Sequence, residues 1–159
     1  MAVSIFARIG TIQGESQDDK HKDEIEVLAW SWGLSQSATI VHGGGGGQGR
    51  ASLQDFNFTH YLDKASPVLM TACATGEHIK DATITIRKAG KDEQEYLVIA
   101  MTDVLVTSVS TSGSEGDNAM EAVSLAFAKV DLAYTPQKSD GSLDAEVLFT
   151  YDLKANRKG

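Results

Sequence analysis

Cysteine is nearly absent from this chain, and its absence excludes two kinds of structural support. Cys73 is the single cysteine among 159 residues, so neither an intramolecular disulfide nor a zinc site built from cysteines can form. Cys73 lies in the apolar stretch VLMTACA, where a free cysteine usually behaves as a small buried hydrophobic residue. The chain is long enough to bury a core of its own, and we expect that core to stabilise it.

Long hydrophobic runs and a signal sequence are also missing. No apolar run approaches the roughly 18 residues that a membrane-spanning helix needs. The first residues, MAVSIFARIG, lack the charged start, the long apolar centre and the cleavage pattern of a signal peptide. We therefore expect the protein to assemble in the cytoplasm and not to insert into a membrane. If the protein is secreted, we expect it to leave without a cleaved signal peptide.

Positive charge is scarce. The chain has 14 Lys and Arg residues against 22 Asp and Glu residues, a formal net charge of -8. Such a chain repels phosphate backbones, which argues against nucleic acid as a partner. Much of the acidity lies in residues 15–26 (ESQDDKHKDEIE), a charge run typical of a solvated loop. The remaining composition, 42% hydrophobic and 23% charged, is that of one soluble globular domain over residues 1–159.

Alternating hydrophobicity dominates the rest of the chain and predicts strands. Residues 24–34 predict a strand that is buried on both sides, or that faces a core on one side and an interface on the other. Its two apolar faces are Ile25, Val27 and Ala29 on one side and Leu28, Trp30 and Trp32 on the other. We expect the two tryptophans to lie in the core or in a subunit interface, and we assign them no chemistry.

Three further segments have the same character. Residues 82–88 (ATITIRK) place two isoleucines inward and Thr83, Thr85 and Arg87 outward. Residues 96–108 (YLVIAMTDVLVTS) are long enough for two strands or one bent strand, and residues 148–153 predict a closing strand. Many short strands separated by turns indicate a β-barrel or a β-sandwich.

One helix is predicted firmly and a second is ambiguous. Ser66 can cap a helix over residues 66–75, Pro67 suits its first position and Gly76 supplies the stop. Residues 120–134 (MEAVSLAFAKVDLAY) have apolar residues close to helical spacing but also alternate like a strand. The pattern alone favours a helix slightly, and the strand remains open.

Five consecutive glycines, Gly43–Gly47, lie between two aromatic segments. Each glycine loses much backbone freedom on folding, so the run is either a disordered linker or a loop ordered by something outside the subunit. A phosphate-binding loop is excluded, because the following segment reads as a strand rather than a helix. The Walker spacing also fails, since Arg50 and Ala51 stand where Lys and Ser or Thr are needed.

The histidines give no sign of catalysis or metal binding. No two of them have the i, i+4 spacing of a metal site, and no G-x-S-x-G motif accompanies them. His21 and His42 are expected to be solvated, and His60 to be a partly buried residue with its hydrogen bonds satisfied. We predict no enzyme, no catalytic residue, no metal and no cofactor. A hydrolase would need a nucleophile and base that we cannot name.

Several motifs in fixed order resemble one family. They are VLAWSWGLSQS, HGGGGGQG, QDFNFTHYLDKASPVLMTACATGEH, ATITIRKAG and EYLVIAMTDVLVTSVSTSGS. Together they resemble the hemolysin-coregulated protein (Hcp) family, the inner-tube subunits of the bacterial type VI secretion system. The resemblance runs from the N-terminus to about residue 143 and weakens after it.

The resemblance implies a mainly β fold, a small barrel of two packed antiparallel sheets with one flanking helix. It makes residues 120–134 largely strand, against the slight preference of the pattern. It also implies homohexameric rings that stack into a tube. This tube is capped by a spike (VgrG) protein, surrounded by a contractile sheath, and carries small effector proteins in its channel.

Two candidate contact sites follow from the resemblance. An extended loop over about residues 37–51 would reach the next ring or a neighbouring subunit. Its ring-stacking residues would be His42, Gly43, Gly44, Gly45, Gly46, Gly47 and Gln48. A polar segment facing the channel would contact effectors through Gly113, Ser114 and Glu115; a surface loop without a partner is the alternative. The alternative function is a stand-alone acidic β-barrel whose glycine loop binds a small ligand.

Overall fold

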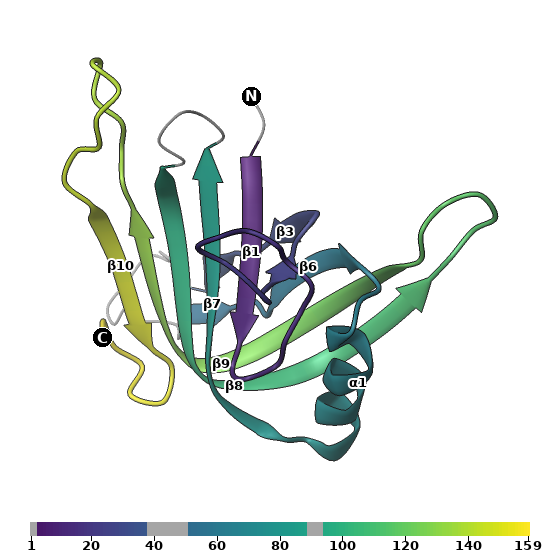
Figure 1. Cartoon of the computed structure of the whole chain (residues 1–159). Coiled ribbons are helices and arrows are strands. Elements are labelled where there is room, and N and C mark those ends of the chain that lie inside the picture. Colours follow the sequence, from purple (N-terminus) through teal and green to yellow (C-terminus); the bar gives the residue numbers. More distant parts are fainter. Residues whose placement is uncertain (1–2, 38–50, 89–93) are drawn as a thin grey trace.

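The computed structural model describes residues 3–37, 51–88 and 94–159 of the chain (Figure 1). Within these residues, ten strands and one helix follow in the order β1 (Val3–Ile9), β2 (Ile25–Glu26), β3 (Ala29–Ser31), β4 (Leu34–Gln36), β5 (Ala51–Leu53), β6 (Phe56–Tyr61), α1 (Ala65–Thr75), β7 (His78–Lys88), β8 (Glu95–Ser112), β9 (Met120–Tyr134) and β10 (Val147–Asp152). The fold is mainly β, as predicted. The described part of the chain contains no helix that is long and apolar enough to cross a membrane.

Eight of these strands form one antiparallel sheet that curls on itself. Its order is β2-β1-β7-β8-β9-β6-β3, and β10 pairs with the second half of β9. The two ends of the order, β2 and β3, are consecutive in the chain, and the residues between them bond to both edges. The Val27 amide donates to the Ile5 carbonyl at 2.9 Å, and the Leu28 amide donates to the Thr59 carbonyl at 2.8 Å. This segment therefore joins β1 to β6 and closes the barrel.

The barrel has two packed layers because β8 and β9 bend together (Figure 1). Met101 and Val104 of β8 are both buried, and so are Phe127 and Val130 of β9. In a regular strand, residues three apart point to opposite faces. The backbone of Asp103 has φ 55, a left-handed conformation that an ordinary strand residue does not adopt. Both strands change their inward side at this corner, and their two halves face each other across the core.

The core fills the space between the two layers. Apolar side chains with at most 1% exposure come from β1, β7 and the first half of β8 on one layer and from β6 and β9 on the other. They include Ala7, Ile9, Ile84, Ile86, Ile99, Met101, Phe56, Phe58, Val123 and Leu125. Leu69 and Ala72 of α1 cover one side of this core.

Residues 24–34, predicted as one strand, form the short strands β2 and β3 and the start of β4. The prediction of one strand is wrong because the segment changes partners. β2 pairs with β1 and β3 pairs with β6. Trp30 and Trp32 pack against the core, one of the two places expected for them. Leu28 and Ala29, one from each predicted apolar face, are exposed in the single chain.

Residues 120–134 form β9 over their whole length. The slight preference for a helix is wrong, and the strand implied by the family resemblance is confirmed. β9 is bonded along one edge by β8 and along the other by β6 and then β10. A strand with hydrogen-bonded neighbours on both edges is stabilised by pairing that local sequence does not encode.

The helix is confirmed, but its cap is not Ser66. α1 begins at Ala65, and the Ala65 amide donates to Asp63 Oδ1 at 2.9 Å. Ser66 lies inside the helix, where its Oγ accepts from the Asp63 amide at 3.1 Å. These two bonds form a reciprocal cap in which Asp63 has the role expected of Ser66. Gly76 ends the helix at φ 65, as predicted.

Candidate functional site

The outer face of β3, β6, β9 and the second half of β8 carries small uncharged side chains. We call it the small-residue face. Cross-strand pairing aligns its side chains in two rows, because residues paired across antiparallel strands lie on the same side of a sheet. The first row is Ser31, Asn57, Ser124 and Ser108. The second row, beside the first, is Ala29, Thr59, Ala122 and Ser110.

Hydrogen bonds within the small-residue face hold its polar atoms. Ser108 Oγ donates to Ser124 Oγ at 3.1 Å, and Ser124 Oγ donates in turn to Asn57 Oδ1. A shallow hollow of about 250 Å³ lies over this part of the sheet. None of the eight side chains carries a formal charge. A neutral surface of this kind can lie against polypeptides of either charge without burying an unpaired ion.

The predicted effector-contact residues Gly113, Ser114 and Glu115 lie at the end of the same two strands. All three are exposed, in the connection between β8 and β9. Gly116 has φ 86, and the Asp117 amide donates to the Ser114 carbonyl at 3.4 Å. Figure 1 shows this hairpin extending away from the barrel. The structure thus places the three residues beside the small-residue face, and their contact with an effector stays a prediction.

The predicted ring-stacking residues, His42 to Gln48, lie outside the described residues. The two ends of their connection are described. Gln36 of β4 pairs with Ala51 of β5, and these two strands form a small second sheet. Trp32 Nε1 donates to the Gln54 carbonyl at 2.8 Å and ties the base of this hairpin to the barrel.

A buried ionic cluster lies beneath the small-residue face. His60 Nε2 is 2.9 Å from Glu121 Oε1, and both side chains have no exposure. His60 Nδ1 is 3.5 Å from Asp63 Oδ2, in the connection that caps α1. Burial lowers the pKa of His60, but hydrogen bonds and charges from Asp63 and Glu121 outweigh it and raise that pKa. The cluster binds β6, β9 and the start of the helix together.

Sequence reasoning predicted a partly buried His60 with its hydrogen bonds satisfied. The ring is instead fully buried, and its Nδ1 has no partner at hydrogen-bond geometry among the described residues. Glu121 and Asp63 were missed. Strict alternation offered a signal, because Phe56, Phe58 and His60 share the inward side of one strand, and Glu121 shares the inward side with Val123. Since His60 and Glu121 are closed to solvent, no substrate can reach them in this conformation. Within the described residues, no group of three or more His, Cys, Asp or Glu could hold a metal ion.

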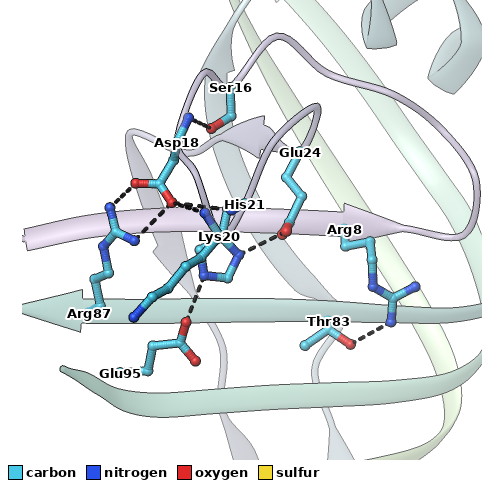
Figure 2. Close-up of polar contacts among 9 residues, drawn as sticks. All are labelled: Arg8, Ser16, Asp18, Lys20, His21, Glu24, Thr83, Arg87 and Glu95. Carbon is cyan, nitrogen blue, oxygen red and sulfur yellow. Dashed lines mark hydrogen bonds and ion pairs between the residues drawn. The ribbon is translucent and has the colours of Figure 1, made fainter. Parts of the chain in front are cut away.

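A second polar cluster fixes residues 13–24, which we call the covering segment, over β1 and β7 (Figure 2). Arg87 of β7 forms an ion pair with Asp18, and Arg87 Nη1 donates to Asp18 Oδ1 at 2.9 Å. This bond outweighs the opposing effect of burial and lowers the pKa of Asp18 to about 2. Ser16 of the covering segment is completely buried. On β7, Thr85 and Arg87 are each only 5% exposed. Thr85 and Arg87 lie on the outer face of β7, opposite Ile84 and Ile86, as predicted, but the covering segment shields them from solvent. The expectation of a solvated loop holds for the exposed residues of the segment and is wrong for Ser16 and His21, which are buried.

His21 is at the centre of the covering segment rather than in solvent, so its predicted exposure is also wrong. Its ring stacks on Phe6 with centroids 4.5 Å apart. Nδ1 lies 2.8 Å from Glu24 Oε2, and Nε2 lies 2.7 Å from Glu95 Oε1 in β8 (Figure 2). Of the other histidines, His78 is exposed and His42 lies outside the described residues. Cys73 is half-buried and packs against the core.

The chain was compared with known proteins. Residues 6–134 match the family described as type VI secretion system effector, Hcp. The chain is 50% identical to protein hcp1 of Pseudomonas aeruginosa over 159 residues, covering 98% of each chain. Its structure superposes on Hcp1 from Salmonella typhimurium with a TM-score of 0.80, 40% identity and full coverage of both chains. A structure described as a type six secretion system protein has a TM-score of 0.93 at 29% identity, over 99% of this chain and 100% of the other.

Proposed function

The chain belongs to the Hcp family of type VI secretion proteins, and we propose that it is a structural subunit of the inner tube. Six copies close into a ring, and rings stack into a tube that is expelled when the surrounding sheath contracts. The tube meets the spike (VgrG) protein at its tip and carries small effector proteins in its channel. The subunit itself catalyses no reaction.

The small-residue face is the observation that carries this proposal. Four adjacent strands present a broad surface without formal charge, on a chain whose net charge is -8. A channel wall that must admit different polypeptides needs such a surface, because charges would bind some cargos tightly and repel others. We propose that this face lines the channel.

Effector contact is assigned to the tip of the β8–β9 hairpin. Gly113, Ser114 and Glu115 are exposed at the end of the strands that supply half of the small-residue face. A bulky substitution such as Ser114→Trp is expected to reduce retention of a cognate effector while rings remain intact. Unchanged co-purification of the effector with Ser114→Trp rings would contradict the assignment. The matched control is Ser139→Trp, at an exposed position in the β9–β10 connection.

Ring stacking is assigned to the connection between β4 and β5, which includes Gly43–Gly47. We expect this connection to become ordered mainly when rings stack, because a glycine run has a large backbone entropy to lose. Amide hydrogen exchange at Gly43–Gly47 should be slower in stacked tubes than in isolated rings. Equal protection in the two states would contradict the assignment.

Oligomeric state tests the proposal as a whole. Light scattering should give a mass about six times the 17.0 kDa of one chain, and negative-stain images should show rings with a central channel. The competing function is a stand-alone acidic barrel that binds a small ligand. A monomer that binds a metabolite would support that function and contradict the tube.

A further inference from the structure

The buried ionic cluster lies at the root of the hairpin that connects β8 and β9. His60 belongs to β6, Glu121 to the start of β9, and Asp63 to the connection that leads into α1. We propose that these three residues form a proton-dependent latch, which holds the hairpin while the His60 ring carries two protons and loosens it when the ring loses one. The consequence for cargo rests on the proposed function, because it requires that the hairpin tip contacts effectors.

Backbone contacts join the latch to the hairpin. Glu121 is the second residue of β9 and pairs with His60 across the sheet. Ala119, the last hairpin residue before β9, accepts a hydrogen bond through its carbonyl from the Leu62 amide at 3.0 Å. Leu62 precedes Asp63 in the connection to α1, and Figure 1 shows this helix and the hairpin on the same side of the barrel. A movement of the connection therefore reaches the hairpin through one hydrogen bond.

The charges that act on the ring are two carboxylates. Glu121 Oε1 is 2.9 Å from Nε2, and Asp63 Oδ2 is 3.5 Å from Nδ1. The connection also carries Lys64, and the covering segment brings Glu15 to the Lys64 amide at 2.8 Å, but both of these side chains are exposed. The aromatic neighbour of His60 on its own strand, Phe58, has no charge. The ring therefore supplies the positive charge between two buried or nearly buried negative ones.

The number of protons on the ring decides how many carboxylates it can hold. An imidazolium donates from both nitrogens, whereas a neutral imidazole has a single N–H. With one proton the ring can serve Glu121 or Asp63 but not both, and the other carboxylate faces a nitrogen lone pair in a poorly solvated site. His60 Nδ1 and Glu121 Oε2 already have no hydrogen-bond partner among the described residues. Within the described residues, no other bond is in place to compensate for the lost proton.

Asp63 is the carboxylate that can leave the ring. Its side chain is 11% exposed, whereas that of Glu121 has no exposure and belongs to a strand paired on both edges. Asp63 also caps α1, because its Oδ1 accepts from the Ala65 amide at 2.9 Å. When the ring holds one proton, we expect Asp63 to turn towards solvent. This movement weakens the cap and loosens both the connection and the hairpin bonded to it.

Amide hydrogen exchange at two pH values tests the latch in the full chain. Burial lowers the pKa of His60, but the two carboxylates raise it by more, so the latch is closed below about pH 6.5 and opens as pH rises through the folded pKa. Protection at the hairpin root, residues 108–112 and 119–122, is corrected for the intrinsic pH dependence of exchange. It should be about threefold or more higher at about pH 6 than at about pH 8.

Two variants remove the latch in different ways. His60→Gln keeps one donor for Glu121 but has no second proton, so its hairpin root should have the low protection at both pH values. Asp63→Asn keeps an oxygen that can cap α1 and removes one carboxylate, so it should lose most of the pH dependence. The exposed His78→Gln and Asp19→Asn are the matched controls and should keep it. Circular dichroism confirms that each variant is folded.

The outcomes separate the latch from global unfolding and from the ring. Hairpin protection that is the same at both pH values, or that changes in His60→Gln as in the unmodified chain, overturns the latch. So does hairpin protection equal to that of the β7 amides, because the hairpin would then open only when the whole fold unfolds. A monomeric chain with the predicted exchange supports the latch and contradicts the proposed function.

Effector release tests the consequence for cargo. Rings loaded with a fluorescently labelled cognate effector should release it about threefold faster at about pH 8 than at about pH 6. His60→Gln rings should release it at one rate, and His78→Gln rings should behave like unmodified rings. Release that does not depend on pH, in rings whose hairpin root does respond, would overturn the link between the latch and the cargo.

Discussion

His60 of β6 and Glu121 of β9 are direct cross-strand partners, and their side chains meet in the core 2.9 Å apart with no exposure to solvent. Asp63 Oδ2 approaches the other ring nitrogen of His60 at 3.5 Å. The strand β6, the connection that follows it and the distant strand β9 therefore meet at one ionisable ring. Removing the charge of that ring would leave two carboxylates close together in a poorly solvated site.

The stability of the subunit should depend on the protonation of His60. The pKa of His60 is raised in the fold, so the group contributes stability that is fully present below its unfolded pKa of about 6.5 and is lost as pH rises through the folded pKa. Urea unfolding at fixed protein concentration should give a larger free energy of unfolding at about pH 6 than at about pH 8. His60→Gln should flatten this dependence, whereas the exposed His78→Gln should keep it. An equally steep profile in His60→Gln would contradict the prediction.

The ionisation of Asp18 should control the stability of the fold at low pH. Its pKa is lowered to about 2 by the bond to Arg87, so its contribution is present above the unfolded pKa of about 3.9 and is lost as pH falls towards the folded value. Acid titration followed by circular dichroism should show Asp18→Asn to be less stable near neutral pH and less sensitive between about pH 4 and pH 2. Asp19→Asn, at the exposed neighbouring position, should behave like the unmodified chain. If the two variants titrate alike, the ion pair does not secure the covering segment.

An element of this fold can be predicted from sequence when the residues that determine it are close to it along the chain. Gly76 and the inward isoleucines of β7 were predicted because turns and alternation are local. β9 was not, because its three partner strands come from both earlier and later parts of the chain and override an ambiguous pattern. The split of residues 24–34 has the same cause, since it depends on two edges that close only when the barrel forms.

The polar clusters show the same limit. Residues 15–26 have the composition of a solvated loop, yet Asp18 meets Arg87 69 positions away and His21 meets Glu95 74 positions away. No local window contains both partners. The small-residue face is likewise assembled from four strands, and each strand alone contributes only two small polar residues or alanines at alternate positions. The family resemblance supplied the fold that composition could not.

Gly14 should tolerate no side chain. A Cβ built there would lie 2.5 Å from the Glu24 carbonyl oxygen and 2.8 Å from Ile25 Cα. Both are backbone atoms, so relief requires the two ends of the covering segment to move apart. Gly14→Ala should lower the free energy of unfolding by about 1–3 kcal/mol. Gly113→Ala, whose nearest contact would be an ordinary 3.9 Å to Ala119 Cβ, is the control and should change stability by less than about 0.5 kcal/mol. Equal urea midpoints for the two variants would contradict the prediction.

Asp103 should respond to substitution according to its backbone rather than its charge. Its φ of 55 is unfavourable for a residue with a Cβ, most of all a β-branched one, and costs glycine nothing. Asp103→Gly should therefore be neutral or stabilising by up to about 1 kcal/mol, and Asp103→Val destabilising by about 1–2 kcal/mol. Asp103→Asn separates the effect of charge, because asparagine tolerates this conformation and the lost pair with Lys154 is exposed. Thermal unfolding of the three variants should rank Gly and Asn above Val. A valine variant as stable as the asparagine variant would mean that the β8 corner does not need a left-handed residue.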